Sequence, residues 1–442
     1  MDILTEASPH IRTRDSLSRM MIDLLIGLSP VILFAFAVYQ LAAVRNLFVS
    51  AATMVLAEFV YVLIVHRLPK DGKKHSFGEK FRYGCAHYRL SNFLVPTVSG
   101  LLYGLITPAC FASVWNPANG GYWMVANPYN PLTDGYAYFV LVAGALFGLV
   151  VGKLVFGGTG HNIFNPAAAG FIFAKECFGS RYRVTDYFGN YFNNITDVQA
   201  GGTFLNGSYA ASASYTNYSL LDLLLGRTPG LMGEVCKVAI LIGLVYLLVR
   251  HTIDWRITLS FLGTFVFLMF FAGVIVNSKD SSIGIFPFLG YQLLSGGVLF
   301  GAVYMITDPV TSPMDSPSRV LYGVIIASST VLIRLLGRSD YIKEGLCFSI
   351  LIGNLFSPAL DYYKWSSPKF VAKNILPIVI LPLLVLGILV VALGVSLPLV
   401  SSGGSSTAAS SGAAASSGPD ASAGGTKTAA VIYGLPFLRG FL

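Results

Sequence analysis

Long uninterrupted apolar stretches recur along this chain, and they limit what it can fold into more than any other feature. A helix rises about 1.5 Å per residue, so about 20 apolar residues cross the hydrocarbon core of a bilayer. Ten such stretches and an eleventh near the C-terminus lie at about residues 20–39, 46–66, 91–108, 137–153, 161–178, 235–250, 257–276, 284–306, 320–336, 344–360 and 375–398. They lack the two-residue alternation of strands in a membrane barrel. With 54% hydrophobic and 11% charged residues, the sequence predicts an all-α integral membrane protein, a bundle of about ten helices with broken helices and an additional C-terminal transmembrane helix.

Lys and Arg residues near the spans indicate the orientation of the bundle. Segment 67–90 carries seven of them, whereas segment 109–136 carries none. Because cytoplasmic loops are enriched in these residues, we expect the N-terminus and segment 67–90 in the cytoplasm. Arg338 and Lys343 fall outside in this scheme, against the rule. Loops of this kind account for most of the net charge of +8, so no nucleic-acid partner is required.

Counting spans from that orientation divides the chain into seven segments. They are a cytoplasmic N-terminal segment 1–19, the first five helices 20–178, an extracytoplasmic loop 179–234, the second five helices 235–360, a cytoplasmic loop 361–374, the additional helix 375–398 and a tail 399–442. The tail is rich in Ser, Gly and Ala, which is typical of a flexible tether. The five Cys and six His residues have no metal-ligand spacing, so no metal site is predicted.

Two polar interruptions of apolar sequence mark candidate sites. They are "GGTGHNIFNPAAAG" at 157–170 and "ITDPVTSP" at 306–313. Broken helices of this kind often line a ligand site or an ion pathway, although neighbouring helices can also satisfy the polar groups of a simple turn. The residues that we assign to a second flavin site or an ion pathway are Asn162, Phe164, Asn165, Asp222, Thr307, Asp308 and Thr311.

Asp308 is the strongest of these candidates, because an ionisable residue at membrane depth is costly to bury. Thr307 and Thr311 add oxygen atoms, the kind of environment that a hard cation such as Na⁺ favours. The alternative is an Asp that caps a helix end after the break. Elsewhere, "NIFNPA" at 162–167 and "NLFSPA" at 354–359 share four of six residues. One motif opens its apolar stretch and the other closes it, so a simple inverted repeat does not make them equivalent.

Residues 197–203, Asp-Val-Gln-Ala-Gly-Gly-Thr, resemble the flavinylation motif, usually Asp-Gly-x-Ser/Thr-Gly-Ala-Thr. In that motif an FMN transferase links FMN to the final Thr through a phosphoester. Asp197, Gly201 and Thr203 match the motif, and Gly201 and Gly202 give the acceptor steric room. Ala200 replaces the usual Ser/Thr, and Gly202 replaces the usual Ala. An ordinary polar loop is the alternative interpretation, and Thr216 is a rival acceptor that lacks the preceding Asp.

Four further stretches extend this resemblance over roughly residues 8–370. They are "SPHIRTRDSLSRMMIDLLIGLSP" at 8–30, "GHNIFNPAAAG" at 160–170, "YSLLDLLLGRTPGLMGE" at 218–234 and "TDPVTSP" at 307–313. Together they resemble the D subunit of the Rnf complex, an ion-translocating ferredoxin:NAD⁺ oxidoreductase. That protein is similar to the B subunit of the Na⁺-pumping NADH:quinone oxidoreductase.

The resemblance implies a ten-helix subunit with covalent FMN on the extracytoplasmic Thr203 and often a second, noncovalent flavin, riboflavin. It also implies maturation by an FMN transferase, and partners that include the FMN-bearing G subunit and the iron–sulfur and membrane subunits of the complex. Membrane lipid surrounds such a subunit, which lies in the plasma (inner) membrane of a bacterium or archaeon. Residues 371–442 lie beyond the usual end of the family and have no role to transfer.

The resulting hypothesis is an electron-relay subunit of a translocase that couples ferredoxin:NAD⁺ oxidoreduction to Na⁺ or H⁺ translocation, and not a complete enzyme alone. A flavin supplies the electron chemistry, and the protein supplies placement and electrostatics. The competing class is a secondary transporter or channel subunit without a redox cofactor. A third interpretation is a eukaryotic glycoprotein, because Asn194, Asn206 and Asn217 begin N-x-[ST] sequons.

Overall fold

The computed structural model describes ten stretches of the chain. They are residues 16–65, 77–109, 114–116, 121–123, 135–178, 219–228, 230–279, 284–336, 345–362 and 372–396. All of them belong to one compact unit, Met1–Leu399. The flavinylation-like motif and the Ser/Gly/Ala tail lie outside the described residues.

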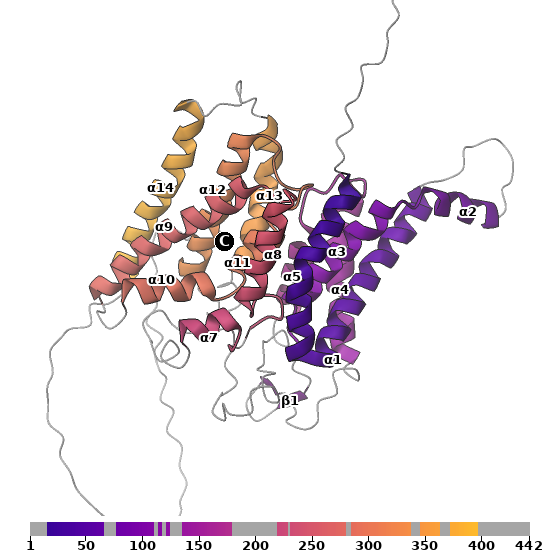
Figure 1. The fold of residues 1–442 in the computed structure, drawn as a ribbon, viewed down its shortest axis with the longest axis horizontal. Coiled ribbons are helices and arrows are strands. Elements are labelled where there is room, and N and C mark those ends of the chain that lie inside the picture. The colour runs from indigo at the N-terminus through magenta and orange to yellow at the C-terminus, as the bar shows by residue number, and fades with distance from the viewer. Residues whose placement is uncertain are drawn as a thin grey trace, which may run out of the picture. The chain divides into compact units, whose positions relative to one another are not determined.

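The described chain is almost entirely helical, so the all-α prediction is confirmed (Figure 1). The helices are α1 (Leu17–Val65), α2 (Phe77–His87), α3 (Leu90–Ile106), α4 (Gly135–Gly152), α5 (Pro166–Cys177), α7 (Leu220–Leu225), α8 (Lys237–Val249), α9 (Trp255–Lys279), α10 (Ile285–Leu294), α11 (Val298–Tyr304), α12 (Ser316–Leu336), α13 (Leu346–Tyr362) and α14 (Ala372–Ser396), with a 3-10 turn η2 at Leu154–Phe156. A small antiparallel hairpin pairs β1 (Val114–Asn116) with β2 (Gly121–Trp123). Neither this hairpin nor the amphipathic helix α2 is predicted from the apolar stretches.

Helix α1 contains the first two predicted apolar stretches. Its 49 residues correspond to about 73 Å of continuous helix, far more than a bilayer core needs. Gln40 interrupts it with a φ of 46° and a ψ of −123°. The two parts of α1 on either side of Gln40 therefore correspond to two separate spans.

Glycines bring the backbones of α1 and α3 into direct contact. A Cβ atom added at Gly100 would lie 2.6 Å from the Ala51 Cα, and one added at Gly104 would lie 2.9 Å from the Asn46 main-chain oxygen. The same holds between α4 and α5, where a Cβ on Gly148 would lie 2.2 Å from the Pro166 oxygen. Small residues at helix contacts are the usual means of tight packing inside membranes.

Two predicted spans differ from continuous helices. The stretch 284–306 divides into α10 and α11, which are bent by 51° at a break of a few residues. Gly296, within the break, has a φ of 65°, which favours glycine. Helix α5 begins only at Pro166, because residues 157–165 form turns in which Gly157, Gly158 and Gly160 all have positive φ.

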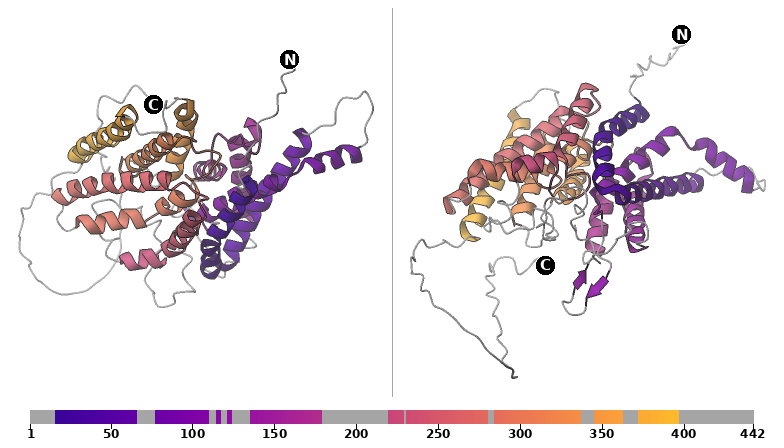
Figure 2. Two further views of the ribbon diagram at one scale, coloured as in Figure 1. Left: turned by 45° about the horizontal axis from the view of Figure 1, so that its top comes forward. Right: turned by 60° about the horizontal axis from the view of Figure 1, so that its bottom comes forward.

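The described helices fall into two groups of contacts, which Figures 1 and 2 colour from indigo to magenta and from red to yellow. Helix α1 packs along α3 and also contacts α4, while α4 packs on α5. In the second group α12 packs on α9, α13 and α14. Helices α8 and α13 join the groups through contacts with α1 and α5.

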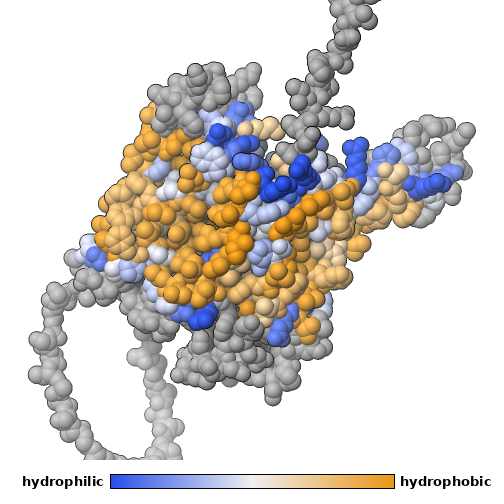
Figure 3. Space-filling model, viewed as in Figure 1, coloured by the Kyte–Doolittle hydropathy of each residue, from blue (hydrophilic) through white to orange (hydrophobic). Residues whose placement is uncertain are grey.

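The surface and helix lengths agree with a membrane environment. Among the described residues, four helices are long and apolar enough to cross a bilayer, or five if the bent pair α10 and α11 counts as one span. Large apolar side chains such as Phe48, Leu56 and Val249 are well exposed, and Figure 3 shows a broad hydrophobic surface with hydrophilic residues gathered at its edges. The chain is a multi-pass membrane protein.

Candidate functional site

The two similar sequence motifs meet in space. Asn165 caps the start of α5, where its side-chain oxygen accepts from the N–H groups of Ala167 and Ala168. Its side-chain amide donates to the Met305 carbonyl oxygen at 3.2 Å. With the Asn354 amide oriented to satisfy its neighbours, Asn354 Oδ1 accepts from the Asn165 N–H at 2.8 Å. The segment before α5, the segment after α11 and helix α13 therefore join at Asn165.

A buried ion pair lies beside this junction. Lys153 Nζ is 3.0 Å from Glu58 Oε2, and the two side chains are 0% and 1% exposed. The Thr159 hydroxyl donates to Glu58 Oε1 at 2.7 Å. The carboxylate of Asp308 also acts electrostatically on Lys153. Lys153 is absent from the predicted set, although a Lys inside the apolar sequence "VVGKLVFGG" is the kind of signal that identifies it.

Asp308 organises its own turn in the segment between α11 and α12. Its Oδ1 accepts from the Val310 N–H at 3.2 Å, and its Oδ2 accepts from the Thr311 hydroxyl at 3.3 Å. The Thr307 hydroxyl instead donates to the Val303 carbonyl oxygen at 2.6 Å. Asp308 and Thr311 thus form a pair, while Thr307 turns back toward α11.

The polar contacts form two clusters. Thr159, Glu58 and Lys153 make one of them, and Asp308 and Thr311 make the other. Between the clusters the only link within the described residues is the electrostatic attraction of Asp308 for Lys153, and the two clusters together are here called the polar chain. Buried polar groups carry a desolvation cost unless they are paired. Glu58 is paired with Lys153 and Thr159 from another segment, whereas Asp308 and Thr311 pair within their own turn.

The remaining predicted residues of the 157–170 segment lie close to this chain. Asn162 is 8% exposed, and its Oδ1 has no hydrogen-bond partner within the described stretches. The Phe164 N–H donates to the Gly152 oxygen at 3.4 Å, and its ring lies 6.4 Å from that of Phe156. Within the described chain, no group of three or more His, Cys, Asp or Glu residues is arranged to hold a metal ion.

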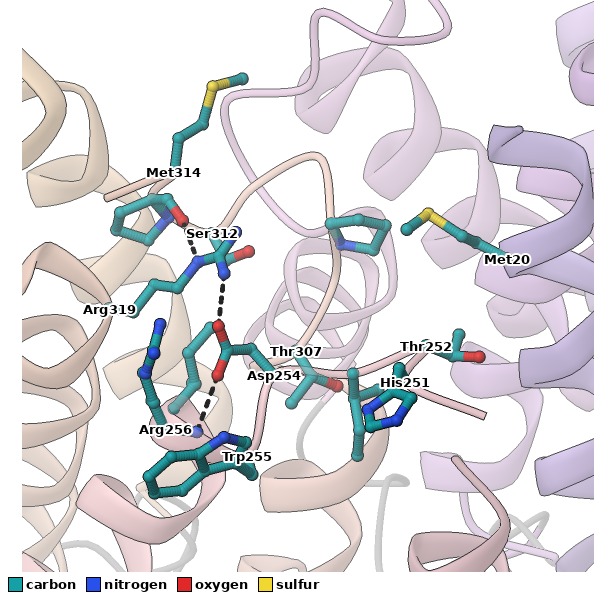
Figure 4. Close-up of a pocket in the computed structure, with 14 residues that line it drawn as sticks. Met20, His251, Thr252, Asp254, Trp255, Arg256, Thr307, Ser312, Met314 and Arg319 are labelled. Carbon is teal, nitrogen blue, oxygen red and sulfur yellow. Dashed lines mark hydrogen bonds and ion pairs between the residues drawn. The ribbon is translucent and has the colours of Figure 1, made fainter. Parts of the chain in front are cut away.

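A pocket of about 310 Å³ lies beside the same segment (Figure 4). It is lined by Met20, His251, Thr252, Ile253, Asp254, Trp255, Arg256, Ile257, Thr307, Pro309, Ser312, Pro313, Met314 and Arg319. Of the predicted residues, Thr307 lines it. Its walls come from the turn between α8 and α9 and from residues 307–314, which are far apart in sequence.

A network of charged side chains fixes the shape of this pocket. Arg319 forms an ion pair with Asp254 and donates to the Pro313 oxygen at 3.0 Å. Asp254 Oδ1 also accepts from the Arg256 N–H at 2.9 Å, and the Arg256 guanidinium donates to the Ser316 hydroxyl at 2.6 Å. The dashed lines in Figure 4 mark the interactions of Arg319 with Asp254 and Pro313 and that of Asp254 with Arg256.

The pocket has the volume of a small ligand site, near the lower end of the usual range. Small-molecule sites are usually about 300–1,000 Å³ in volume, with apolar walls and a few well-placed polar groups. Trp255, Pro309 and Met314 supply apolar surface, while the Arg256 guanidinium carries hydrogen-bond donors besides the one given to Ser316. The pocket is a candidate for the noncovalent flavin that the sequence resemblance implies.

Asp222 lies apart from both the polar chain and the pocket. It sits in α7, where it forms a reciprocal capping box with Ser219, and α7 contacts α8 and α10. Hydrogen bonds from the Ser219 hydroxyl and main-chain N–H hold the pKa of Asp222 below its usual value. The structure therefore gives Asp222 a local role at a helix start, and among the predicted residues in the described stretches none contacts it.

The predicted flavin acceptor cannot be placed from this structure. Thr203, Asp197, Gly201 and Gly202, together with the rival Thr216, lie outside the described residues. The description resumes at Ser219, directly before α7. The covalent attachment therefore stays a prediction from the sequence.

Comparison with known proteins provides independent information on the chain as a whole. A family model described as the NQR2, RnfD, RnfE family matches residues 4–126 and 132–368. The B subunit of the Na(+)-translocating NADH-quinone reductase from Chromohalobacter salexigens is 34% identical over 281 residues, which are 63% of this chain and 58% of that protein. Its namesake from Pseudomonas aeruginosa is 28% identical over 368 residues, which are 81% and 87% of the two chains.

The family match extends over both groups of helices, and it includes the polar chain and the pocket. Members of this family take part in membrane electron transfer that is coupled to ion translocation, so other subunits of a membrane complex are the expected partners. The predicted resemblance is thus confirmed at the level of the family. The chain belongs to the NQR2, RnfD, RnfE family.

Proposed function

We propose that this subunit relays electrons across the membrane through two flavins, one of them FMN bound covalently to Thr203. The observation that carries this proposal is the family match over residues 132–368, which includes the flavinylation-like sequence 197–203. In this proposal the Thr203 hydroxyl forms a phosphoester with FMN in a reaction catalysed by an FMN transferase. Asp197, Gly201 and Gly202 serve as the recognition sequence.

The pocket beside Thr307 is the proposed site of the second flavin, riboflavin. A bound flavin supplies one-electron chemistry there. The chain's own residues hold it: Trp255 offers an aromatic face, and the Asp254–Arg319 ion pair keeps the pocket walls together. Thr307 lines the pocket, and the next residue, Asp308, belongs to the polar chain. In this proposal a conformational change at the pocket therefore reaches the polar chain directly.

The polar chain of Glu58, Lys153, Asp308 and Thr311 is the proposed coupling route for Na⁺ or H⁺. A cation or proton that enters this chain competes with Lys153 for the two carboxylates. Coupling requires two states of the protein with different affinities for the ion. The segment between α11 and α12 is suited to this task, because it contacts both the pocket and the polar chain.

The parent complex in this proposal is a ferredoxin:NAD⁺ oxidoreductase of the Rnf type. The sequence stretches at 8–30, 160–170, 218–234 and 307–313 support that choice, whereas the two relatives described above carry the name of an NADH-quinone reductase. The purified complex distinguishes the two, because a Rnf-type complex reduces NAD⁺ with reduced ferredoxin. Quinone reduction by NADH in its place would assign the chain to the other complex.

The proposed orientation places the N-terminus and the pocket on the cytoplasmic side and residues 179–234 outside. Its support is the distribution of Lys and Arg between segments 67–90 and 109–136. Single cysteines in segments 66–76 and 179–218, labelled with a membrane-impermeant reagent in intact cells, test it. The orientation requires labelling in the second segment and none in the first.

The experiment that tests the covalent flavin is ultraviolet fluorescence of the denatured protein band on a gel. The chain is made in cells that also make an FMN transferase, and the wild type is compared with Thr203→Val and the matched control Thr216→Val. We expect fluorescence from the wild type and the control, and a dark Thr203→Val band. A dark wild-type band would support the competing class, a transporter or channel subunit without a redox cofactor.

A further inference from the structure

The turn that ends α8 has a backbone conformation that glycine usually supplies. His251 has a φ of 54°, in the left-handed region that is unfavourable for residues with a Cβ atom. Its N–H donates to the Leu248 oxygen at 3.0 Å, and the Thr252 N–H donates to the Leu247 oxygen at 3.0 Å. This pair of bonds forms a Schellman helix end, in which the left-handed residue is usually glycine. Helix α7 ends on such a glycine, Gly226, with a φ of 84°, so the histidine at the end of α8 requires a separate explanation.

One carboxylate on α1 fixes this turn on both sides of His251. Asp23 accepts from Arg250 Nε and Nη2 at 3.3 Å and from the Thr252 hydroxyl at 3.4 Å. The Tyr246 hydroxyl, in the last turn of α8, donates to the same carboxylate at 3.3 Å. The Asp23 side chain is only 10% exposed. Strained residues persist where their surroundings hold them in place, and they cluster at ligand sites.

The fixed turn forms one wall of the pocket. His251 and Thr252 line it together with Met20, which lies three residues before Asp23 on α1 (Figure 4). The His251 side chain is exposed, and within the described part of the chain its ring forms no hydrogen bond. The left-handed residue therefore brings an imidazole without a partner to the pocket.

Other polar side chains of the pocket already have protein partners. The Thr307 hydroxyl donates to a main-chain oxygen of α11, and the Thr252 hydroxyl donates to the carboxylate on α1. Asp254 and Arg319 form an ion pair with each other. A neutral imidazole has one hydrogen-bond donor and one acceptor, so the His251 ring has both to offer to a ligand.

We propose that His251 contacts the ligand of this pocket and that Asp23 is the positioning residue that holds it there. The proposal rests on the proposed function of the pocket as the riboflavin site. The edge of a flavin ring system carries carbonyl oxygens that accept hydrogen bonds and a ring N–H that donates one, so either imidazole nitrogen has a partner on it. Asp23 does not line the pocket, and it acts through its bonds to the two neighbours of His251.

The test combines the riboflavin Kd of the purified full-length chain, from equilibrium dialysis after removal of bound flavin, with the melting temperature. In His251→Gly we expect a Kd that is higher by about fivefold, the contribution of one hydrogen bond. Its melting temperature should equal or exceed that of the wild type, because glycine adopts the left-handed conformation without strain. A residue with a purely structural role would not lower affinity while stability is kept.

His251→Asn is the matched control. Asparagine tolerates the left-handed conformation, and its amide keeps a donor and an acceptor on a shorter side chain. We expect a Kd between those of the wild type and His251→Gly. The comparison of His251→Asn with the wild type also serves if the glycine variant does not accumulate, and a wild-type Kd in every variant of His251 that accumulates overturns the proposal.

Asp23→Asn tests the positioning role. It keeps an oxygen atom for Thr252 but loses the ion pair with Arg250, so the riboflavin Kd should rise by about threefold. Because Asp23 acts through His251, the double variant Asp23→Asn, His251→Gly should bind no more weakly than His251→Gly alone. Losses from the two single variants that multiply in the double variant overturn the positioning role.

Trp255→Ala separates this proposal from the assignment of the pocket. A wild-type Kd in Trp255→Ala, or a wild-type chain that binds no riboflavin, overturns the pocket as the riboflavin site and the role of His251 with it. Weaker binding by Trp255→Ala together with a Kd of His251→Gly within about twofold of the wild type overturns the role of His251 alone.

Discussion

The buried ion pair between Glu58 and Lys153 gives the sharpest prediction of stability. Replacement of Lys153 by Met leaves the Glu58 carboxylate, which is 1% exposed, without its counter-charge. At the observed 3.0 Å, two unit charges attract each other by about 5.5 kcal/mol with an effective dielectric constant of about 20. Since loss of one partner of a buried pair typically costs about 3–5 kcal/mol, we expect a loss in that range.

The assay is a titration with SDS that unfolds the protein in mixed micelles and gives its free energy of unfolding. The double variant Glu58→Gln, Lys153→Met removes both charges, so it should be more stable than Lys153→Met by about 2 kcal/mol. Thr159→Ala is the matched control, because it removes one hydrogen bond to Glu58 and should cost about 1 kcal/mol. The single variant Glu58→Gln completes the cycle. If the losses from Glu58→Gln and Lys153→Met add up to the loss of the double variant within about 0.5 kcal/mol, the reasoning is refuted.

Three further predictions concern other parts of the site. Asn165→Ala removes the cap of α5 and the bond to Met305, so the same SDS titration should show a loss of about 1–3 kcal/mol, with a loss below about 0.5 kcal/mol arguing against the cap. Ser219→Ala should raise the pKa of Asp222, because it removes a hydrogen bond to the charged carboxylate. In the wild type, the lowered pKa of Asp222 stabilises α7 at pH values above the pKa that Asp222 has in the unfolded chain. This contribution is lost as the pH falls through the lower pKa of the folded state. Carbon NMR of labelled Asp should show that Asp222 titrates at higher pH in the variant than in the wild type. Trp255→Ala should reduce the riboflavin that co-purifies with the chain at least tenfold, measured by chromatography after denaturation, while FMN fluorescence of the gel band stays unchanged.

The sequence predicts the helical fold well because long apolar stretches have few other ways to cross a membrane. Within that fold, the polar segment at 306–313 and the turn at 157–165 are visible as interruptions, and the structure places Asn165 next to Met305. The gap between the predicted stretches 20–39 and 46–66 includes Gln40, where α1 is interrupted. By contrast, the sequence predicts one continuous span where α10 and α11 are bent by 51°, since a local backbone conformation at Gly296 accompanies that bend.

The site itself is only partly predictable, because its groups come from distant parts of the chain. Glu58 and Lys153 are 95 positions apart in the sequence, and only folding shows that they pair. The pocket likewise combines Trp255 and Thr307 with Met20, which no local motif connects. Asp222 is predicted as a site residue because it is acidic and lies near a span. The structure instead shows a local role for it, in a capping box with Ser219.

The glycine contacts of α3 and α4 have a mechanical consequence. Where two backbones touch without intervening side chains, as at Gly100 against Ala51 and at Gly148 against Pro166, neither helix can rotate about its axis without a steric clash. These contacts therefore restrict relative motion of α1 against α3 and of α4 against α5. The segment between α11 and α12 is held differently, by separate polar contacts such as the Thr311–Asp308 and Arg319–Pro313 hydrogen bonds, which can break one at a time.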